Sequence, residues 1–321
     1  MNDSYVLGID WGGTRIKWGA FQPGQEFLAQ GILPTNAQDE MADNVARVMD
    51  ELDAACKEIG RPPKAIGLAL TGVVDPNQGV VLLPGKVRGL EGYPIVAEMK
   101  KRFGIPVIAD NDGRAALLAE WKLGAARHCS WAVVVTIGTG VGSGVLLDGK
   151  VLRDAHLQFG TQLGHLVIDS SSAQLCLTGS RGTGELLCSA SALARAVGSA
   201  LQRGLPSTLT ELYSKDPRLV DFRAIMEQGV AFEDPVCLDE LERWTRQLGW
   251  LLVNAAHAYA PEVIVLAGGA MLGAEYFLPA LHKHVNQHMF RYPHGQELPV
   301  VVSDLCEQSG VLGAGLLAFD L

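Results

Sequence analysis

Two glycine-rich turns, each lying between two apolar runs, constrain the fold of this chain more than any other feature. The first turn, WGGT, lies in the segment 5–21, and the second, TIGTGVGSG, lies in the segment 131–152. Apolar runs on both sides of a glycine turn are typical of β-hairpins. When the second segment is slid onto the first, Thr136 falls on Asp10. The repeated plan predicts two related lobes that each contain such a hairpin.

Helix and strand patterns alternate over the rest of the chain. Apolar residues at helical spacing and glycine stops predict helices at 38–59, 94–104, 114–124, 248–260 and 309–319. Buried strands are expected at 64–72, 105–112, 262–270 and 299–305. The polar, proline-containing stretch 200–235 is expected to form helical excursions at the surface. A β-rich start followed by this alternation predicts an α/β protein with mixed sheets flanked by helices.

Composition excludes several classes of protein. The 321 residues suffice for one large or two medium domains, and a hydrophobic content of 48% supplies a core. A formal net charge of −9 argues against a surface that binds nucleic acid. The start MNDSYVLGID predicts no signal peptide, and the apolar runs are too short and broken for a membrane span. Six cysteines without a CxxC pair suit reduced thiols, so we expect a cytoplasmic protein.

The glycine turns are suited to binding phosphate. A glycine-rich turn lets backbone N–H groups converge on phosphate oxygens without a Cβ in the way. Neither turn is a Walker A loop, and a strand follows the second where a dinucleotide fold needs a helix. The alternative is two tight hairpins with glycines at positive φ. A third pair, Gly268-Gly269, would admit a base or ribose, or else only allows a helix to pack closely on a strand.

Two aspartates each stand at the end of a predicted strand. Asp10 comes directly before the first turn, and an acid beside phosphates needs a divalent cation between them, so Asp10 is a candidate for holding hydrated Mg2+. Asp112, in ADNDGRAALLAEW, ends a strand and opens a helix. One interpretation makes Asp112 the helix N-cap, and the other makes it a general base that accepts a proton from a substrate hydroxyl. The residues alone leave both interpretations open.

Five segments, in this order and at these distances, resemble the ROK family of sugar kinases and sugar-responsive repressors: GIDWGGTRIKWG, ALTGVVDPNQGVV, DNDGRAALLAEW, TIGTGVGSGVLLDGKV and QLGHLVID. The resemblance extends over nearly the whole chain. It implies two ribonuclease-H-like lobes of the actin/hexokinase type, with a cleft between them that holds ATP and a sugar. The small lobe would comprise residues 1–115 and a C-terminal helix at 306–321, and the larger lobe would comprise residues 116–305.

The same resemblance implies roles for particular residues. Asp112 would be the catalytic base, with Asn111 beside it in the sugar pocket, and Asp10 would lie near Mg2+. The two phosphate loops and an adenosine-side turn would bind ATP through Asp10, Gly12, Gly13, Thr14, Thr136, Gly138, Thr139, Gly140, Gly268 and Gly269. Homodimers are typical of the family, so we expect one here.

The segment GTQLGHLVIDSSSAQLCLTGSRGTGELLC departs most from the family pattern. Relatives usually carry GExGH and then CxCGxxGCxE, whereas TQLGH places Gln162 where a glutamate normally contacts the sugar. Of the four zinc-ligand positions of the family, His165 and Cys176 remain, but Thr178 and Thr183 stand in place of cysteines. Structural zinc takes four N or S ligands, so we expect none here. Hydrogen bonds from serines and threonines must then hold this loop, or it is mobile.

The remaining sugar contacts are expected from Gln162, His165 and Glu185, the last at the position of the family's second sugar-contacting glutamate. Lys86, in LLPGKVRGL, stands where relatives often have an asparagine that touches the sugar. Together, Gln162 and Lys86 make the pocket less negative, which would suit an acidic or otherwise unusual substrate. The alternative is that Lys86 points to solvent.

The leading hypothesis is an ATP-dependent kinase that phosphorylates a hydroxyl of a sugar or sugar derivative, as hexokinases and glucokinases do. Repressors of the family carry an N-terminal DNA-binding domain, which a first strand at about residue 5 disfavours. Two alternatives stay open, namely a kinase that uses polyphosphate as donor and a catalytically silent sugar sensor. The retained Asn111, Asp112 and phosphate loops speak against the sensor.

Overall fold

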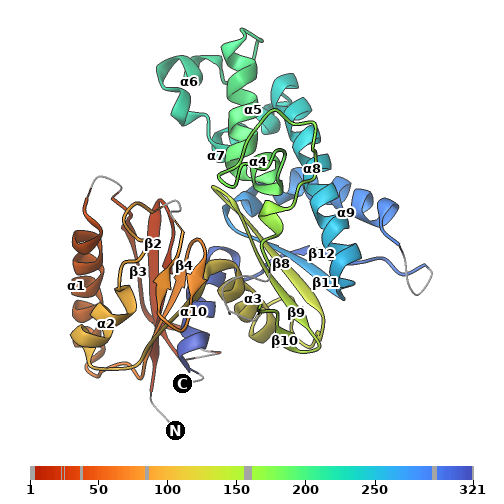
Figure 1. Ribbon diagram of the computed structural model, residues 1–321. Coiled ribbons are helices and arrows are strands. Elements are labelled where there is room, and N and C mark those ends of the chain that lie inside the picture. Colours follow the sequence, from red (N-terminus) through yellow and green to blue (C-terminus); the bar gives the residue numbers. More distant parts are fainter. Residues whose placement is uncertain are drawn as a thin grey trace.

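The computed structural model describes residues 4–22, 24, 26–36, 39–83, 87–154, 161–290 and 295–319. The described residues form two α/β lobes, each built on a five-stranded sheet (Figure 1). Helices α3 and α10, which span Asp112–Lys122 and Ser309–Phe319, lie between the two sheets. Asp112, the first residue of α3, belongs to the site described below.

The first sheet has the strand order β3-β2-β1-β4-β7. Its strands are β1 (Val6–Trp11), β2 (Arg15–Phe21), β3 (Phe27–Pro34), β4 (Ile66–Leu70) and β7 (Val107–Asn111). Strand β1 runs antiparallel to β2 and parallel to β4, so the hairpin predicted around WGGT is present. Leu7 and Ile9 of β1 pack with Val45 of α1 (Met41–Ile59) and Met99 of α2 (Ile95–Phe103), which cover one face of the sheet.

The second sheet repeats this arrangement in the order β10-β9-β8-β11-β12. Its strands are β8 (Ala132–Ile137), β9 (Val141–Leu147), β10 (Lys150–Val151), β11 (Val263–Ala267) and β12 (Val300–Val302). Strand β8 runs antiparallel to β9 and parallel to β11, as β1 does with β2 and β4. Helices α8 (Pro235–Tyr259) and α9 (Ala274–His288) cover one face, and α3 covers the other through Ala116 and Leu117. The shared topology confirms the two related lobes predicted from the glycine turns.

The second lobe carries additional helices between β10 and α8. They are α4 (Gly184–Cys188), α5 (Ala190–Gln202), α6 (Thr210–Lys215), α7 (Phe222–Ala224) and a π-helical turn (Ile225–Gly229). The expectation of surface excursions at 200–235 is partly wrong, because Phe222, Ile225 and Met226 are buried in the main core of this lobe. Their apolar side chains lie one helical turn apart within FRAIM, so one face of the short helix packs inward.

Short elements complete the fold. Strands β5 (Val74–Asp75) and β6 (Val80–Val81) form a small separate hairpin. Single 3-10 turns lie at Leu163–His165, Pro217–Leu219, Val230–Phe232, Gly269–Gly273 and Cys306–Gln308. In the described ranges, no helix has the length and hydropathy needed to cross a bilayer.

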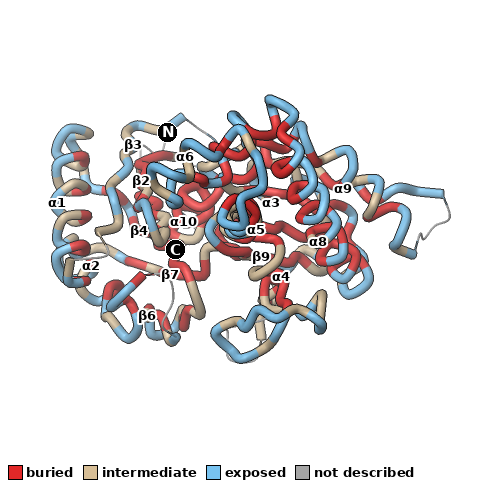
Figure 2. Tube along the Cα trace, turned by 90° about the horizontal axis from the view of Figure 1, so that it is seen from above, coloured by how far each residue is buried: buried red, intermediate tan, exposed pale blue. Residues whose placement is uncertain are grey.

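Helix α10 approaches its neighbours closely enough that side chains are excluded. A Cβ at Gly67 of β4 would overlap the carbonyl oxygen of Ala314, and a Cβ at Gly313 would overlap that of Ala115 in α3. Glycine is required at both positions because backbone meets backbone there. Viewed from above, α3 and α10 are largely buried segments near the middle of the molecule (Figure 2). The site described next lies at the N-terminal end of α3.

Candidate functional site

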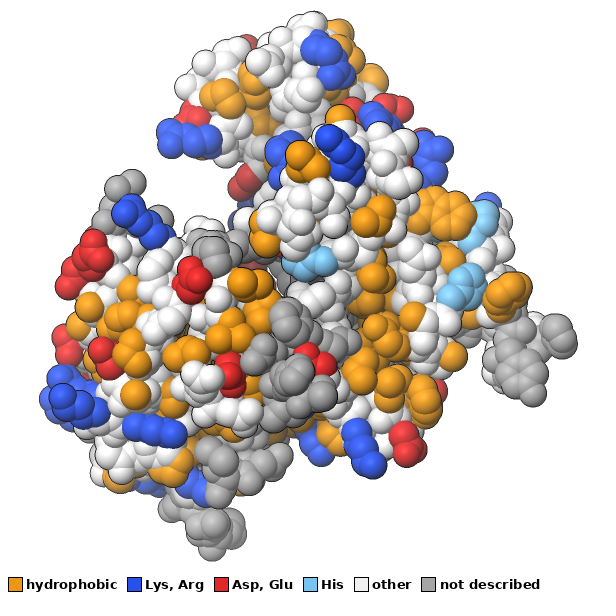
Figure 3. Space-filling model, in the orientation of Figure 1, with side chains coloured by type: hydrophobic (Ala, Val, Ile, Leu, Met, Phe, Trp, Pro, Cys, Tyr) orange, Lys and Arg blue, Asp and Glu red, His pale blue; other side chains and the backbone are white. Residues whose placement is uncertain are grey.

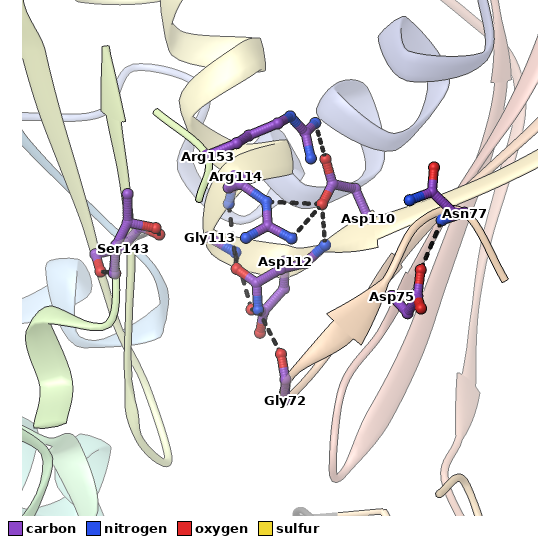
Figure 4. A network of polar contacts seen from close by, with 11 residues as sticks. Gly72, Asp75, Asn77, Asp110, Asp112, Gly113, Arg114, Ser143 and Arg153 are labelled. Carbon is purple, nitrogen blue, oxygen red and sulfur yellow. Dashed lines mark hydrogen bonds and ion pairs between the residues drawn. The ribbon is translucent and has the colours of Figure 1, made fainter. Parts of the chain in front are cut away.

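The N-terminus of α3 meets the end of β7 at the sequence Asp110-Asn111-Asp112 (Figure 4). Asn111 is the N-cap, since its Oδ1 accepts hydrogen bonds from the N–H groups of Gly113 (3.0 Å) and Arg114 (3.3 Å). Asp112 is the first helical residue, so the interpretation of Asp112 as N-cap is wrong. The Nδ2 of Asn111 donates to Oδ1 of Asp112 (2.9 Å) and thereby orients that carboxylate.

A network of charged side chains surrounds the buried carboxylate of Asp110, two residues before Asp112. Asp110 is 1% exposed, and its Oδ1 accepts hydrogen bonds from the N–H of Asn111 (2.7 Å) and from Nε of Arg114 (2.7 Å). Its Oδ2 pairs with Arg153, which follows β10 in the second lobe (Figure 4). A buried carboxylate is stable only when it is paired in this way. The network therefore fixes the backbone that precedes Asp112 and joins the two lobes.

A pocket of about 560 Å³, which we call the Glu185 pocket, opens at Asp112 between the lobes. Its lining comprises Thr71, Gly72, Val73, Leu83, Asn111 and Asp112 from the first lobe and its junction with α3, and Val141, Gly142, Ser143, Gln162, His165, Leu177, Thr178 and Glu185 from the second. Four of the predicted sugar-contact residues thus share one pocket with Asp112. The fifth, Lys86, lies outside the described residues, so its direction stays a prediction.

Local hydrogen bonds place the polar side chains of this pocket. Glu185 lies in the first turn of α4, and its Oε2 accepts a hydrogen bond from the N–H of Val141 (3.1 Å). His165 ends a 3-10 turn that is anchored to β9, because the N–H of Leu163 donates to Oγ of Ser143 (3.1 Å). The Nδ1 of His165 is buried, and no hydrogen-bond partner for it is present among the described residues. A bound ligand or water is one way to satisfy such an atom.

A second pocket of about 110 Å³, the Asp10 pocket, also reaches Asp112. It is lined by Asp10, Lys17, Asp112, Ala116, Thr136, Gly268, Gly269, Cys306, Glu307, Ser309 and Gly310. Burial, and then the charge of Asp112, raises the pKa of Asp10 to about 6, although Lys17 opposes the shift. Two carboxylates that share so small a space repel each other, so a cation would stabilise this pocket.

A third pocket of about 390 Å³, the Gly138 pocket, continues from the second. It is lined by Arg15, Lys17, Gly138, Thr139, Ala190, Ser191, Ala194, Asp221, Phe222, Arg223, Met226, Glu227, Gly269, Ala270, Leu272, Gly273 and Glu307. Lys17, Gly269 and Glu307 line both the second and the third pocket. Glu307 pairs with Nζ of Lys17 (3.0 Å) and with Nη2 of Arg15 (3.6 Å), and its hydrogen bond to Lys17 lowers the pKa of Glu307. The cationic side chains of Arg15 and Lys17 are thereby held where the Asp10 pocket and the Gly138 pocket join.

Most of the predicted nucleotide-binding residues reach these two pockets. They are Asp10, Thr136, Gly138, Thr139, Gly268 and Gly269. The others, Gly12, Gly13, Thr14 and Gly140, belong to the same two turns but not to the pocket linings, so their role stays a prediction. None of the six glycines in the two turns has a positive φ, so the alternative of hairpins with glycines at positive φ is wrong in its backbone conformation, although both hairpins are present. A Cβ at Gly138 would meet no atom within 4 Å, which leaves this turn open to a ligand.

The loop at the family's zinc position is a hydrogen-bonded hairpin, residues 166–183, closed by two isolated β-bridges. The Sγ of Cys176 lies 2.9 Å from Oγ1 of Thr178, which donates to Oγ of Ser180 (3.3 Å). Oδ1 of Asp169 accepts hydrogen bonds from the N–H (3.0 Å) and the hydroxyl (2.5 Å) of Ser171. Of the two outcomes expected for this loop, the structure shows the hydrogen-bonded one. The described residues contain no group of three or more His, Cys, Asp or Glu side chains that would hold a metal.

Four charged residues of the site were not singled out from the sequence. Arg15 and Lys17 stand in the first quoted motif, and their alternate positions on β2 place both side chains at the junction of the pockets. The two-residue spacing of Arg15 and Lys17, which puts both side chains on one face of a strand, was the sequence signal that would have identified them. Glu307 and Arg153 carry no local signal, because long-range packing brings them to Lys17 and Asp110.

The fold and the site together define a class of protein. The protein has two sheets of one topology and a series of pockets between them, and an aspartate at a helix N-terminus lines two of these pockets. These features characterise a two-lobed α/β protein of the actin/hexokinase type. Comparison with known proteins narrows this class to one family.

A sequence model of the ROK family matches residues 6–320. A glucokinase of Halalkalibacterium halodurans is 28% identical over 326 residues, which cover 99% of this chain and 96% of that protein. The crystal structure of a ROK hexokinase from Thermus thermophilus is 30% identical and has a TM-score of 0.77, with 98% of each chain covered. A ROK glucokinase from Streptomyces griseus, crystallised with glucose and AMPPNP, has a TM-score of 0.86 at 24% identity and covers 99% of this chain and 100% of its own. The chain belongs to the ROK family.

Proposed function

We propose that this protein is an ATP-dependent kinase that phosphorylates a hydroxyl group of a sugar or sugar derivative. The position of Asp112 carries the proposal, because Asp112 lines both the Glu185 pocket and the Asp10 pocket. The Asp10 pocket in turn shares Lys17 and Gly269 with the Gly138 pocket. The three adjacent pockets would accommodate a sugar hydroxyl, the transferred phosphoryl group and the nucleotide, as in-line phosphoryl transfer requires.

In this mechanism Asp112 acts as the general base. Its carboxylate accepts the proton of the sugar hydroxyl as the hydroxyl oxygen attacks the γ-phosphorus of ATP. The bond between the γ-phosphorus and the bridging oxygen breaks, ADP leaves with that oxygen, and the proton passes from Asp112 to water. Asn111 holds the base in place, and its own Nδ2 is held by the carbonyl of Gly72 (2.9 Å). Positioning and charge neutralisation, rather than covalent chemistry, supply the rate.

The chemistry of the Asp10 pocket fits Mg2+. Mg2+ takes oxygen ligands and keeps several waters, and Asp10 offers a carboxylate whose pKa is raised by burial and by Asp112. Asp10 would hold the ion through water, and the ion would neutralise charge on the phosphates. Lys17 and Arg15 supply further positive charge at the junction with the Gly138 pocket.

The remaining assignments form part of the same proposal. The phosphates would lie against Thr136, Gly138 and Thr139, with adenosine near Gly268 and Gly269. The sugar would contact Asn111, Gln162, His165 and Glu185. The lobe of residues 1–115 with 306–321 would close on the lobe of residues 116–305, and the protein would form a homodimer, which family membership supports.

Replacement of Asp112 with asparagine tests the base. Asparagine keeps the shape of the side chain but cannot accept the proton, so kcat should fall by roughly 10²–10⁴-fold while the melting temperature stays within a few degrees. ADP release is measured with a panel of hexoses, amino sugars and sugar acids. The matched control is Asp148→Asn in the exposed turn between β9 and β10, which should leave kcat unchanged. Turnover near that of the natural protein in the Asp112 variant would contradict the mechanism.

The choice of phosphoryl donor and the sensor alternative are decided in the same assay. With ATP as donor, added polyphosphate should not support turnover and should not compete for the Gly138 pocket. If polyphosphate replaced ATP at equal rate, the donor in the proposal would be wrong. Sugar binding by calorimetry without any turnover would instead identify a sensor.

A further inference from the structure

Two exposed leucines face the mouth of the Glu185 pocket from opposite lobes. Leu83 follows β6 in the first lobe and is 44% exposed, and Leu177 lies in the hairpin 166–183 of the second lobe and is 70% exposed. Both line the same pocket as Asp112. A single exposed leucine needs no explanation, but apolar side chains on both walls of a ligand pocket mark a place for apolar ligand atoms.

The pocket changes character with depth. At its base, Asn111 is 7% exposed and donates a hydrogen bond to the carboxylate of Asp112, and Ser143, which is 4% exposed, lines the same pocket. At its mouth stand Leu83 and Leu177. A ligand that fills the pocket therefore presents a hydroxyl to the polar base and a hydrophobic group to the mouth. An unsubstituted hexose carries hydroxyl groups around its ring and has no alkyl or aryl group with which to cover both leucines.

We propose that the natural acceptor is a sugar that carries an apolar substituent remote from the hydroxyl that is phosphorylated, of the class of alkyl or aryl glycosides, and that Leu83 and Leu177 bind this substituent. The proposal rests on the sugar-kinase function and specifies its substrate class. The serine- and threonine-rich remainder of the hairpin is held by its own hydrogen bonds, and Leu177 of this hairpin lines the pocket.

The experiment uses a series of ligands that differ only in apolar length. After the panel has identified the best free sugar, its methyl, propyl and pentyl glycosides are prepared as both anomers. Their dissociation constants are measured by competition with the free sugar, so the result does not depend on which hydroxyl reacts. For one anomer, binding should tighten roughly two- to fourfold with each added methylene, the upper value corresponding to complete burial of a CH2 group.

Variants assign the effect to the two leucines. Leu177→Ser and Leu83→Ser should each flatten the dependence on chain length and leave the affinity for the free sugar unchanged. The matched control is Leu175→Ser, because Leu175 lies in the same hairpin and is 57% exposed but does not line the pocket. Thermal unfolding of each variant verifies that the hairpin remains folded.

Three results would overturn the inference. One is no gain with chain length for either anomer in the natural protein. Another is a gain that persists in both leucine variants. The third is a loss of affinity for the free sugar in these variants, which would mean that the leucines contact each other when the lobes close. If no sugar were phosphorylated or bound at all, the proposed function itself would fail, and this outcome is distinct from the other three.

Discussion

At the scale of single residues, the site brings two carboxylates together. Asp10 and Asp112 line one small pocket, and burial followed by the charge of Asp112 raises the pKa of Asp10 from 3.8 to about 6. The folded protein then holds this proton more tightly than the unfolded chain does. The stability that protonated Asp10 contributes is complete below pH 3.8 and is lost as the pH rises through 6. At neutral pH the fold therefore tolerates a buried charge that the proposed function would need.

Replacing Asp10 with asparagine should therefore stabilise the fold at high pH and abolish turnover. The free energy of unfolding should rise by ~1–3 kcal/mol at pH 8, since one pKa unit corresponds to about 1.4 kcal/mol. Below the ordinary pKa of aspartate the difference should vanish. Urea unfolding at several pH values measures it, with Asp148→Asn as the control that shows no such pH dependence. If Asp10→Asn lowered the free energy of unfolding at pH 8, the charged form of Asp10 would not destabilise the fold as inferred.

The sequence allowed Asp10 to be predicted because it stands at the end of a predicted strand, directly before a glycine turn, and Asp112 because it stands between a strand and a helix. It did not settle which of Asn111 and Asp112 caps α3, since the two side chains are equally good caps and adjacent. The hydrogen bonds of the folded protein give the cap to Asn111. Glu307 could not be predicted, because it reaches Lys17 only through the packing of the chain's last helix.

At the scale of elements, the hairpin 166–183 keeps its shape through polar contacts that a metal-binding loop does not need. Thr178 stands at a family zinc-ligand position, and its Oγ1 contacts the Sγ of Cys176 instead (2.9 Å). Hydrogen bonds around that sulfur outweigh the effect of burial and lower the pKa of the Cys176 thiol. The main-chain N–H of Cys176 donates to the carbonyl of Ser180 (2.9 Å), which closes the tip.

Purified protein should therefore contain no stoichiometric zinc, and a chelator should not change its melting temperature. Elemental analysis and thermal unfolding with and without EDTA measure these two quantities. Breaking the contact at the tip by Thr178→Val should lower the protection of the hairpin amides in hydrogen exchange, while Thr210→Val, in exposed α6, should not affect them. One zinc per chain would contradict the interpretation of this segment.

Some elements with a strong period were predicted, but the helix α5 was missed, and α8 was predicted only at 248–260 although it begins at Pro235. The helix at 38–59 and the strand at 64–72 appear as α1 and β4 because long apolar stripes must be buried. The strand β3 was not predicted, since alternate residues of this edge strand are half-buried at most and its pattern is weak. In the 200–235 region, short apolar groups between polar residues concealed the buried turn that lines the Gly138 pocket.

At the scale of the whole molecule, the lobes are coupled by the ion-pair network behind Asp112. Asp110 lies in the first sheet, and Arg153 lies beside the second. The surface of the two lobes carries charges of both signs, with hydrophobic side chains among them on the face shown in Figure 3. The pair of Asp110 with Arg153 differs from these surface charges because its carboxylate is buried, and partly buried pairs are screened much less by salt.

Arg153→Ala should lower the free energy of unfolding by roughly 1–3 kcal/mol, the value for losing a hydrogen bond to a charged group. Asp110 would keep Arg114 as a partner, so the protein should still fold. The conservative Arg153→Lys should recover part of the loss. Arg203→Ala, an exposed arginine at the end of α5, is the control and should change stability little. If Arg153→Ala matched this control, the network would not couple the lobes.

The close contact of α10 with α3 and β4 also governs how this protein is made. Lys122, which ends α3, and Ser309, which begins α10, stand 187 positions apart in the chain. At roughly 5–20 residues per second, a ribosome needs on the order of 10–40 s to travel that distance. During this interval the face of the first sheet that α10 will cover has no helix packed against it, because α10 has not yet been synthesised. The emerging chain is therefore open to aggregation and to chaperone binding until its last helix arrives.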